Sequence, residues 1–220
     1  MLSEESLELI VQDHLAELEW QAGHGPDFAP GSGERDTWND IVLRGRLRNA
    51  VRNLNPDVPE EYLDQAIGEV ITPKSQSAIA ENRRIHQILV EGYRGIEYID
   101  HEGNVQNPTI YFLSSQPHKN DYLSLNQVTV ANLDGERRFD VVCYVNGMPL
   151  AFIEVKKTGA NTSVEGAYNQ LQTYVKEFGM AFRFANIVIP SDDLSAKYGT
   201  PFTPWNHFAP WNVDCLLYTS

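Results

Sequence analysis

Cysteine and long apolar runs are scarce in this 220-residue sequence. Its two cysteines, Cys143 and Cys215, are too few for a disulfide framework or a cysteine-based zinc site. No stretch approaches the roughly 18 consecutive apolar residues that a membrane helix requires. The first residues, Met1 to Glu5, are acidic and lack the apolar centre of a signal peptide. We therefore expect a cytoplasmic protein without disulfides and without membrane association.

Basic residues are also in short supply. Lys and Arg number 17 against 30 Asp and Glu, which gives a formal net charge of −13. Such a balance disfavours nucleic acid as a partner, because phosphates attract Lys and Arg. The distribution weakens this exclusion. Residues 1–36 hold nine acids and one arginine, a net charge of −8, whereas residues 136–183 hold five acids and six basic residues, a net charge of +1.

Hydrophobic periodicity predicts helices first and strands later. A content of 42% hydrophobic residues, including 10% aromatic residues, is sufficient for one folded domain. Three- and four-residue spacing of apolar side chains predicts helices, and β-branched or aromatic runs between turn residues predict strands. The predicted helices are 4–20, about 37 or 39 to 54, 60–71, 77–91 and 164–178. The predicted strands are 95–99, 108–112, 125–130, 140–145, 150–156 and 184–189, with 22–36 as a loop and 191–211 irregular.

This order predicts an α/β fold in a single domain over residues 1–211. Its helical part covers about residues 1–92, and its sheet-bearing part covers about residues 93–190. Residues 212–220 show no periodicity, and we expect them to be the ragged end of a fragment.

Two neighbouring strands carry a carboxylate each at one end. Asp140 begins the first strand, and Glu154 and Lys156 lie two apart on the second, so these two share a face. Asp140 reaches that face only if it pairs opposite Glu154. A simple two-residue turn at Asn146-Gly147 would place it on the wrong side, so this arrangement predicts a three-residue loop or a bulge.

Two carboxylates and one ammonium group suit metal-assisted hydrolysis of a phosphodiester. Carboxylate oxygens of Asp140 and Glu154 are the hard ligands that Mg²⁺ prefers, and the backbone carbonyl of Val155 is a natural further ligand. Lys156 would orient the attacking water and stabilise anionic oxygens. The alternative is that all three side chains are simply solvated strand ends.

A second element supports the catalytic interpretation. Gln170 and Tyr174 lie four residues apart on the predicted helix 164–178, and therefore on one face. This helix follows the strand that carries Glu154 after a short loop, so its first half can lie over the strand end. The alternative is an exposed Gln170 and an ordinary core Tyr174.

Several segments resemble the restriction subunit (HsdR) of type I restriction-modification enzymes, over about residues 4–211. The segment Arg138-Phe139-Asp140 to Ile153-Glu154-Val155-Lys156 resembles its nuclease motif, and Gln170 with Tyr174 resembles a motif shared with RecB-like nucleases. Further matches in the same order are Leu43-Arg44-Gly45-Arg46-Leu47, Asn53-Leu54-Asn55-Pro56, Asn82-Arg83-Arg84-Ile85-His86 and Asn120-Asp121-Tyr122 with Asn126-Gln127-Val128-Thr129-Val130.

The resemblance implies a PD-(D/E)xK endonuclease fold, in which helices flank a central mixed sheet, and Mg²⁺ as cofactor. It implies that Asp140 and Glu154 bind the metal and that Lys156 is catalytic. Gln170 and Tyr174 are implied as accessory site residues. An acid of the first helix joins such sites, and the sequence leaves Glu5 and Glu8 open.

The resemblance also implies partners. They are double-stranded DNA, the methyltransferase (M) and specificity (S) subunits, and an ATP-driven helicase or translocase that follows the nuclease domain. No Gly-x4-Gly-Lys-Ser/Thr loop occurs here, so we expect ATP to bind outside this fragment. Arg137, Arg138 and Lys157 flank the site and are candidate DNA contacts, with surface solubilisation as the alternative.

Two other functions stay open at this point. One is a RecB-like nuclease of DNA repair. The other is a catalytically inactive nuclease fold that docks subunits or binds DNA.

Overall fold

A computed structural model describes residues 3–133, 135–157, 163–192 and 194–211. Residues 212–220, expected to be a ragged end, lie outside the described residues. The helices and strands in chain order are α1 (Glu4–Glu17), β1 (Gln21–His24), the 3-10 helix η1 (Gly25–Phe28), α2 (Arg44–Leu54), α3 (Glu60–Ile71), α4 (Ala78–Glu91), β2 (Tyr98–Ile99), β3 (Val105–Gln106), η2 (Pro117–Lys119), β4 (Tyr122–Asn132), β5 (Gly135–Val145), β6 (Met148–Lys156), α5 (Val164–Glu177), η3 (Gly179–Phe184), β7 (Ile187–Asp192), β8 (Lys197–Tyr198), η4 (Trp205–His207) and β9 (Ala209–Pro210).

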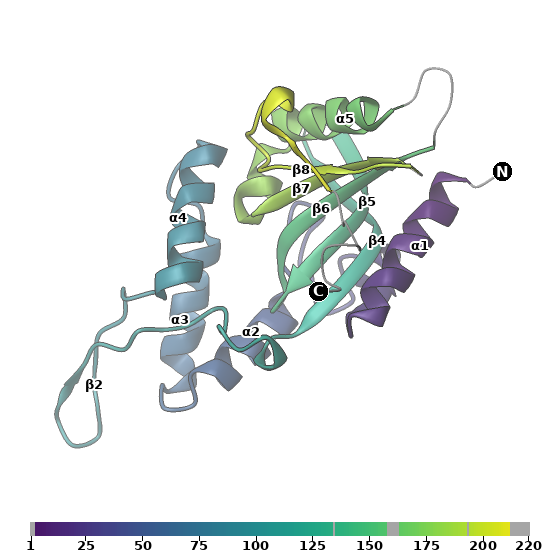
Figure 1. The fold of residues 1–220 in the computed structure, drawn as a ribbon. Coiled ribbons are helices and arrows are strands. Elements are labelled where there is room, and N and C mark those ends of the chain that lie inside the picture. The colour runs from purple at the N-terminus through teal and green to yellow at the C-terminus, as the bar shows by residue number, and fades with distance from the viewer. Residues whose placement is uncertain (1–2, 134, 158–162, 193, 212–220) are drawn as a thin grey trace, which may run out of the picture.

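A five-stranded mixed sheet forms the centre of the molecule, in the order β1-β4-β5-β6-β7 (Figure 1). The outer pairs β1–β4 and β6–β7 are parallel, and β4–β5 and β5–β6 are antiparallel. One face packs against α1 through a small cluster around Leu7, and the other packs against α5 in the main core. The expected α/β fold, a mixed sheet flanked by helices, is confirmed.

The start of α2 differs from the sequence prediction. The helix begins at Arg44 and not near residue 37 or 39. The buried Arg35 explains the difference, because its guanidinium donates to the carbonyls of Trp38 (3.1 Å) and Asp40 (2.5 Å). The Trp38 carbonyl also accepts from the backbone N–H of Ala131 in β4 at 3.0 Å, so this segment is hydrogen-bonded to other parts of the chain and not within a helical turn.

The predicted loop 22–36 is wrong at its beginning. Gln21–His24 forms β1, whose residues pair in parallel with Leu123–Asn126 of β4. Gln12 of α1 donates to the carbonyls of Gly23 (2.9 Å) and Ser124 (3.1 Å), which joins helix and strands. A short polar edge strand has no hydrophobic alternation to reveal it. A boundary near residue 92 therefore does not separate helices from sheet.

Two further strand predictions need correction. Of 95–99, only Tyr98–Ile99 forms a strand, and 108–112 makes a single bridge between Ile110 and Tyr93. The side chain of Asn55 satisfies both the N–H and the carbonyl of Tyr111, in place of a neighbouring strand. The last central strand starts at Ile187 and not at residue 184, because residues 179–184 form η3.

The hairpin between β5 and β6 contains a bulge. Pairing runs from Val141–Ile153 to Cys143–Ala151 and then shifts by one residue to Tyr144–Pro149 and Val145–Met148. Asn146 and Gly147 make a two-residue turn with φ angles of 53° and 76°. Of the two predicted solutions, the bulge is confirmed.

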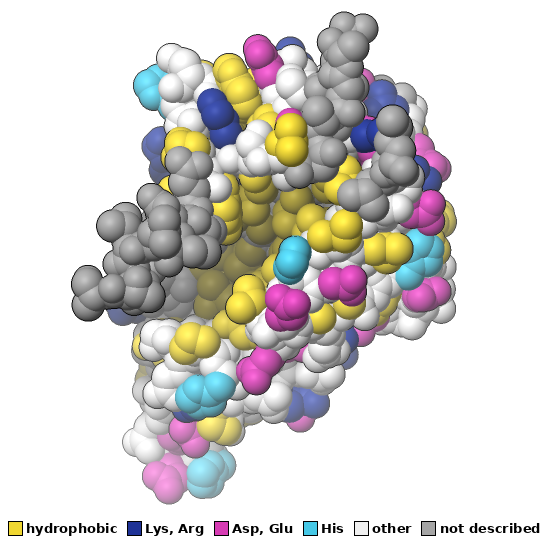
Figure 2. Space-filling model, turned by 45° about the vertical axis from the view of Figure 1, so that its right-hand side comes forward, with side chains coloured by type: hydrophobic (Ala, Val, Ile, Leu, Met, Phe, Trp, Pro, Cys, Tyr) yellow, Lys and Arg dark blue, Asp and Glu magenta, His cyan; other side chains and the backbone are white. Residues whose placement is uncertain are grey.

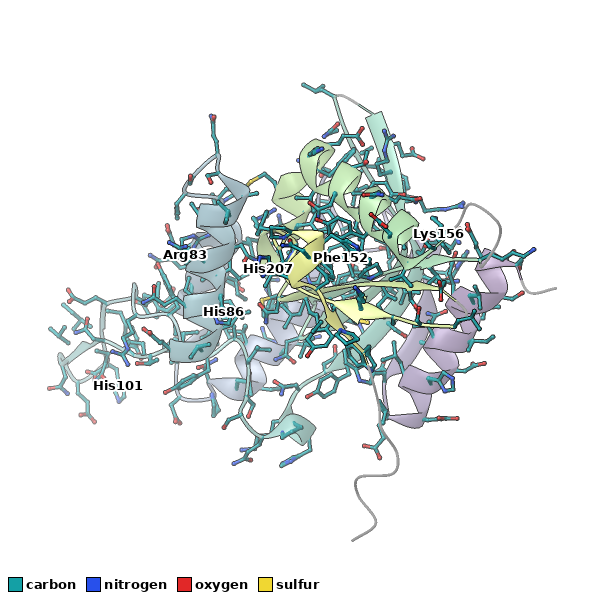
Figure 3. All side chains as sticks on the ribbon, turned by 45° about the horizontal axis from the view of Figure 1, so that its top comes forward. Arg83, His86, His101, Phe152, Lys156 and His207 are labelled. Carbon is teal, nitrogen blue, oxygen red and sulfur yellow. The ribbon has the colours of Figure 1, made fainter. Side chains whose placement is uncertain are left out.

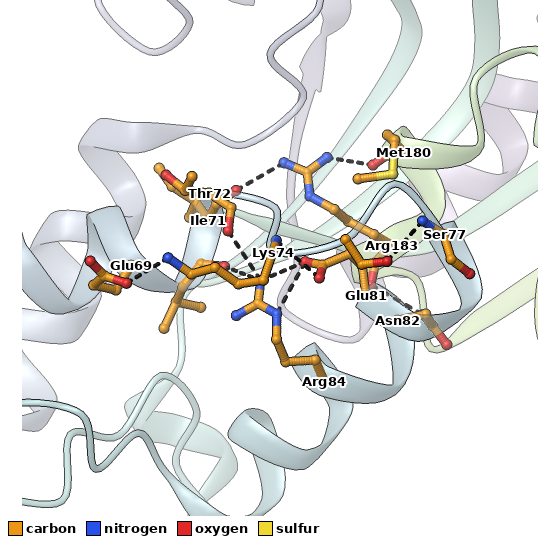
Figure 4. Close-up of polar contacts among 12 residues, drawn as sticks. Glu69, Ile71, Thr72, Lys74, Ser77, Glu81, Asn82, Arg84, Met180 and Arg183 are labelled. Carbon is orange, nitrogen blue, oxygen red and sulfur yellow. Dashed lines mark hydrogen bonds and ion pairs between the residues drawn. The ribbon is translucent and has the colours of Figure 1, made fainter.

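Polar side chains of α4 join this helix to the segment after α3 and to η3 (Figure 4). Glu81 is 1% exposed and accepts hydrogen bonds from Arg84 at 2.7 Å and from the backbone of Lys74 at 3.1 Å. Asn82 donates to carbonyls of η3 and of Ala185, the latter at 2.8 Å. The motif around Asn82 thus contributes to the packing of the helices.

Hydrophobic side chains line a hollow on the side of the molecule turned forward in Figure 2. Acidic side chains lie along its border. No helix within the described ranges has the length and apolarity needed to cross a membrane.

Candidate active site

Asp140, Glu154 and Lys156 meet at one end of the sheet. The Oδ2 atom of Asp140 accepts a hydrogen bond from the backbone N–H of Val155 at 2.8 Å. The Nζ atom of Lys156 lies 3.0 Å from Oε1 of Glu154. Figure 3 shows Lys156 at this end of the sheet, beside α1, with Phe152 further inside. The structure therefore brings the three predicted side chains together.

Burial shifts the pKa values of these three side chains. Glu154 is 1% exposed, and burial together with the neighbouring Asp140 carboxylate raises its pKa to about 9, against the opposing effect of Lys156. Burial also raises the pKa of Asp140, although the Val155 N–H and Lys156 act against it. Burial alone would lower the pKa of Lys156, but the adjacent carboxylates outweigh it and the net pKa is raised. The ammonium group of Lys156 thus lies close to the carboxyl groups of both Asp140 and Glu154.

Gln170 and Tyr174 lie beside this group on α5. The Nε2 atom of Gln170 donates to the hydroxyl of Tyr174. Burial and the negative charge of Glu154 raise the pKa of Tyr174. Its ring packs edge-on against Phe139, with centroids 5.4 Å apart. The tyrosine therefore fills the core with its ring and presents its hydroxyl on the side of Glu154.

The first helix contributes Glu8 and not Glu5 to the surroundings of Asp140. Glu8 is 3% exposed, and both of its carboxylate oxygens accept from Nε2 of Gln127, at 2.7 and 2.6 Å. Burial raises the pKa of Glu8, and the charge of Asp140 adds to the effect. Glu5 is exposed. Glu4, which the sequence did not single out, lies 3.8 Å from Lys156.

The candidate DNA contacts have different surroundings. Arg137 forms an ion pair with Glu177 of α5 at 2.8 Å, so its charge is already engaged. Arg138 is exposed, and its positive charge lowers the pKa of Glu8. The backbone N–H of Lys157 donates to Glu4 at 3.5 Å. Arg138 is thus the most accessible of the three.

The donor set suits a hard divalent cation. No group of three or more His, Cys, Asp or Glu ligands is arranged around a common point in the described part of the chain. Asp140 and Glu154 provide two carboxylates, and burial raises the pKa of both, with the charge of Asp140 adding to the effect at Glu154. A divalent cation between them would stabilise their ionised forms, and carboxylates are ligands that Mg²⁺ prefers.

Gln127 is a site neighbour that the sequence interpretation missed. It lies in the middle of β4 with a positive φ of 56°. A signal was present, because Asn126-Gln127 puts two polar residues in a row between the apolar Leu125 and Val128. A regular half-buried strand would alternate there.

Comparison with known proteins gives the family. The family model "Type I restriction enzyme R protein N terminus" matches residues 1–207. The MjaIXP endonuclease subunit of a type I restriction enzyme from Methanocaldococcus jannaschii is 27% identical over 90% of this chain and 19% of that protein. The HindI endonuclease subunit of Haemophilus influenzae is 28% identical over 97% of this chain and 20% of that protein. The chain spans about a fifth of the length of these two relatives. Since the family model matches nearly all of it, the chain belongs to the family of type I restriction enzyme R protein N termini.

Proposed function

We propose that this chain is the Mg²⁺-dependent nuclease domain of a type I restriction enzyme R subunit, a phosphodiester hydrolase that cuts double-stranded DNA. The observation that carries the proposal is the meeting of Asp140, Glu154 and Lys156 at the end of β6, in a member of this family. Family membership favours restriction over a RecB-like repair role.

Each site residue has a role that follows from its chemistry. Asp140 and Glu154 would hold the cation, with the Val155 carbonyl as a further ligand. Bound Mg²⁺ supplies Lewis acidity and neutralises negative charge on the phosphate. Lys156 lies 3.0 Å from Glu154 and would donate hydrogen bonds to the attacking water and to a phosphate oxygen.

Gln170 and Tyr174 would orient the phosphate. Their side chains are bonded to each other, so neither turns freely. The hydroxyl of Tyr174 keeps its proton at neutral pH because its pKa is raised, and it therefore remains a hydrogen-bond donor. Arg138 and Lys157 would contact the DNA backbone away from the cleaved bond.

The remaining partners belong to the proposal for the whole subunit. The relatives are named endonuclease subunits and are about five times as long as this chain. We propose that the full subunit binds the M and S subunits, and that its ATP-driven helicase or translocase lies outside this chain. A DNA substrate would be met in the cytoplasm, which supports a cytoplasmic location for the subunit.

Plasmid nicking by the assembled restriction complex, with Mg²⁺ and ATP, tests the proposal. We expect Asp140→Ala, Glu154→Ala and Lys156→Ala each to lower cleavage at least 100-fold, since each removes charge from the reacting centre. ATP hydrolysis should persist, which shows that assembly is intact. Glu61→Gln, an exposed acid of α3, is the matched control and should cleave normally. Cleavage that survives all three alanine variants would refute the assignment and leave an inactive nuclease fold that docks subunits or binds DNA.

A further inference from the structure

The face of the sheet that carries α1 is only partly covered by the described residues. On this face α1 packs against β1, β4, β5 and β6, whereas β7 is packed by α5 from the opposite face. Ala151 of β6 and Ile187 and Ile189 of β7 lie on the α1 side, and all three are partly exposed. Because β6 and β7 are parallel, and parallel strands are normally covered on both faces, this strip of the sheet is unusually open.

The open strip continues beyond β7. β8 lies antiparallel beside β7, in a register that places Tyr198 opposite Ile189 and therefore on the same face. Tyr198 is 40% exposed, and its ring contacts that of Trp211, which is 48% exposed, with centroids 5.5 Å apart. These two aromatic side chains border the open strip on the side away from α1.

The opposite border is formed by α1. Leu7 packs on the sheet in the cluster that Ile189 also joins. Ile10 and Leu18, which are 37% and 70% exposed, follow Leu7 by three and eleven residues and therefore lie along the same side of the helix. Figure 2, in which the side with α1 is turned forward, shows a hollow lined by hydrophobic side chains. A continuous exposed apolar surface of this kind marks a binding surface.

The charges at the border indicate what kind of partner fits the hollow. Acidic side chains lie along the border in Figure 2. On α1, Asp13 and Glu17 are exposed and four residues apart, on the flank next to Ile10. Residues 1–36, which include α1, carry a net charge of −8. A complementary partner therefore has an apolar face flanked by Lys or Arg side chains.

We propose that a helix with an apolar face and basic flanks docks in this hollow, and that it belongs to the part of the R subunit that lies outside this chain. The inference rests on the proposed function, which makes this chain one domain of a longer subunit. A second helix beside α1 would complete the helical layer on this face of the sheet, as α5 does on the other.

Two observations favour the same polypeptide as the source of this helix. The relatives described above are about five times as long as this chain, so most of such a subunit lies outside it. Trp211, near the end of the described residues, lies at the border of the hollow, so a segment that follows it has a short path to the open strip. A segment of the same polypeptide also docks at a high effective concentration.

Cysteine labelling of the full-length subunit tests whether the hollow is covered. Leu18→Cys and Tyr198→Cys probe its two borders. Ile99→Cys and Tyr111→Cys are matched controls, because these positions are 68% and 49% exposed and lie outside the hollow. We expect maleimide to label each border position about tenfold or more slowly than its control, with peptide mass spectrometry reading each position separately. Equal rates at border and control positions would overturn the proposal.

A charge reversal tests the basic flanks of the docked helix. Glu17→Lys on α1 should raise the labelling rate of Tyr198→Cys, on the opposite border, by about threefold or more, because it repels a basic partner. Glu61→Lys changes an exposed acid of α3 and should leave that rate unchanged. No change with Glu17→Lys, or an equal rise with Glu61→Lys, would contradict the proposed chemistry of the partner.

Carbodiimide cross-linking in the assembled restriction complex identifies the source of the helix. The reagent joins carboxylates to lysine amines that contact them, and mass spectrometry locates the linked pair. We expect Asp13 or Glu17 to be linked to a lysine of the same polypeptide, beyond residue 220. Links to the M or S subunit alone, or no link within the polypeptide, would overturn the assignment.

These readouts are separate from DNA cleavage. If the hollow is protected and the complex does not cut DNA, the nuclease assignment fails and the docking surface stands. If DNA is cut and the hollow is labelled as fast as the controls, only the docking surface fails.

Discussion

The carboxylate of Asp140 binds the backbone N–H of Val155 at 2.8 Å, just beyond the last residue pair of β5 and β6, Val141–Ile153. A side chain here takes the place that a backbone carbonyl has in a regular ladder. The two strands can therefore separate without leaving a buried N–H unsatisfied. In the proposed function, the same carboxylate also faces the metal.

Substitutions at Asp140 should separate these two roles. Asp140→Asn keeps an acceptor for the Val155 N–H and removes a negative charge from a crowded site. We expect it to be at least as stable as the wild type. Asp140→Ala should be about 1–3 kcal/mol less stable than the asparagine variant, because the N–H loses its acceptor. Urea unfolding measures the difference, and both variants should fail to cut DNA. Equal stability of the two variants would show that the hydrogen bond contributes little.

The buried Glu154 should make stability depend on pH when no metal is present. Its pKa rises from 4.5 to about 9 on folding, so the folded state holds a proton that the unfolded state releases between these values. Its contribution is complete below pH 4.5 and is lost as pH rises toward 9. Glu154→Gln does not titrate, and we expect it to exceed the wild type in stability by on the order of 2 kcal/mol at pH 7.

Thermal unfolding in EDTA between pH 5 and pH 9 measures this effect. The gain of Glu154→Gln over the wild type should grow steadily with pH. Glu61→Gln changes the same chemistry at an exposed position and should give a curve parallel to that of the wild type. A gain independent of pH would mean that Glu154 is ionised throughout.

Tyr174→Phe should impair cleavage more than it impairs folding. The ring contact with Phe139 remains, and only the hydroxyl bonded to Gln170 is lost. We expect about 1 kcal/mol or less of lost stability, and about tenfold slower cleavage, since a phosphate-orienting donor is removed. Tyr168→Phe on the same helix removes a hydroxyl bonded to the Thr203 carbonyl (3.3 Å) and should cut DNA normally. Equal cleavage rates in the two variants would remove Tyr174 from the site.

Gly147→Ala should destabilise the fold strongly. Gly147 has a φ of 76°, and a Cβ atom there would lie 2.4 Å from the Leu43 carbonyl oxygen and 2.6 Å from the Leu47 nitrogen. We expect a loss of about 2 kcal/mol or more in urea unfolding, because both the backbone conformation and the space exclude a side chain. Gly68→Ala in α3 meets no atom within 4 Å and should be neutral or slightly stabilising. Similar losses at both glycines would contradict this account.

The hairpin of β5 and β6 shows how much of the structure local sequence patterns can predict. Two apolar runs, an Asn-Gly turn, and the requirement that Asp140 approach Glu154 were enough to predict a bulge or a longer loop. The structure contains the bulge between Cys143 and Tyr144. By contrast, β1 was missed because the strand it pairs with, β4, lies about 100 residues away in the chain. The hydrophobic periodicity within a segment does not indicate which distant segment will pair with it.

The sequence by itself determined the strands that carry Asp140 and Glu154, the face shared by Glu154 and Lys156, and the helix that carries Gln170 and Tyr174. These features follow from side-chain periods of 2.0 and 3.6 residues, which are properties of neighbouring residues. Only the tertiary structure decided that Glu8 and not Glu5 is buried beside Asp140, and that Gln127 holds it. Both outcomes depend on how α1 rests on β4, which is fixed by packing between segments that are distant in the chain.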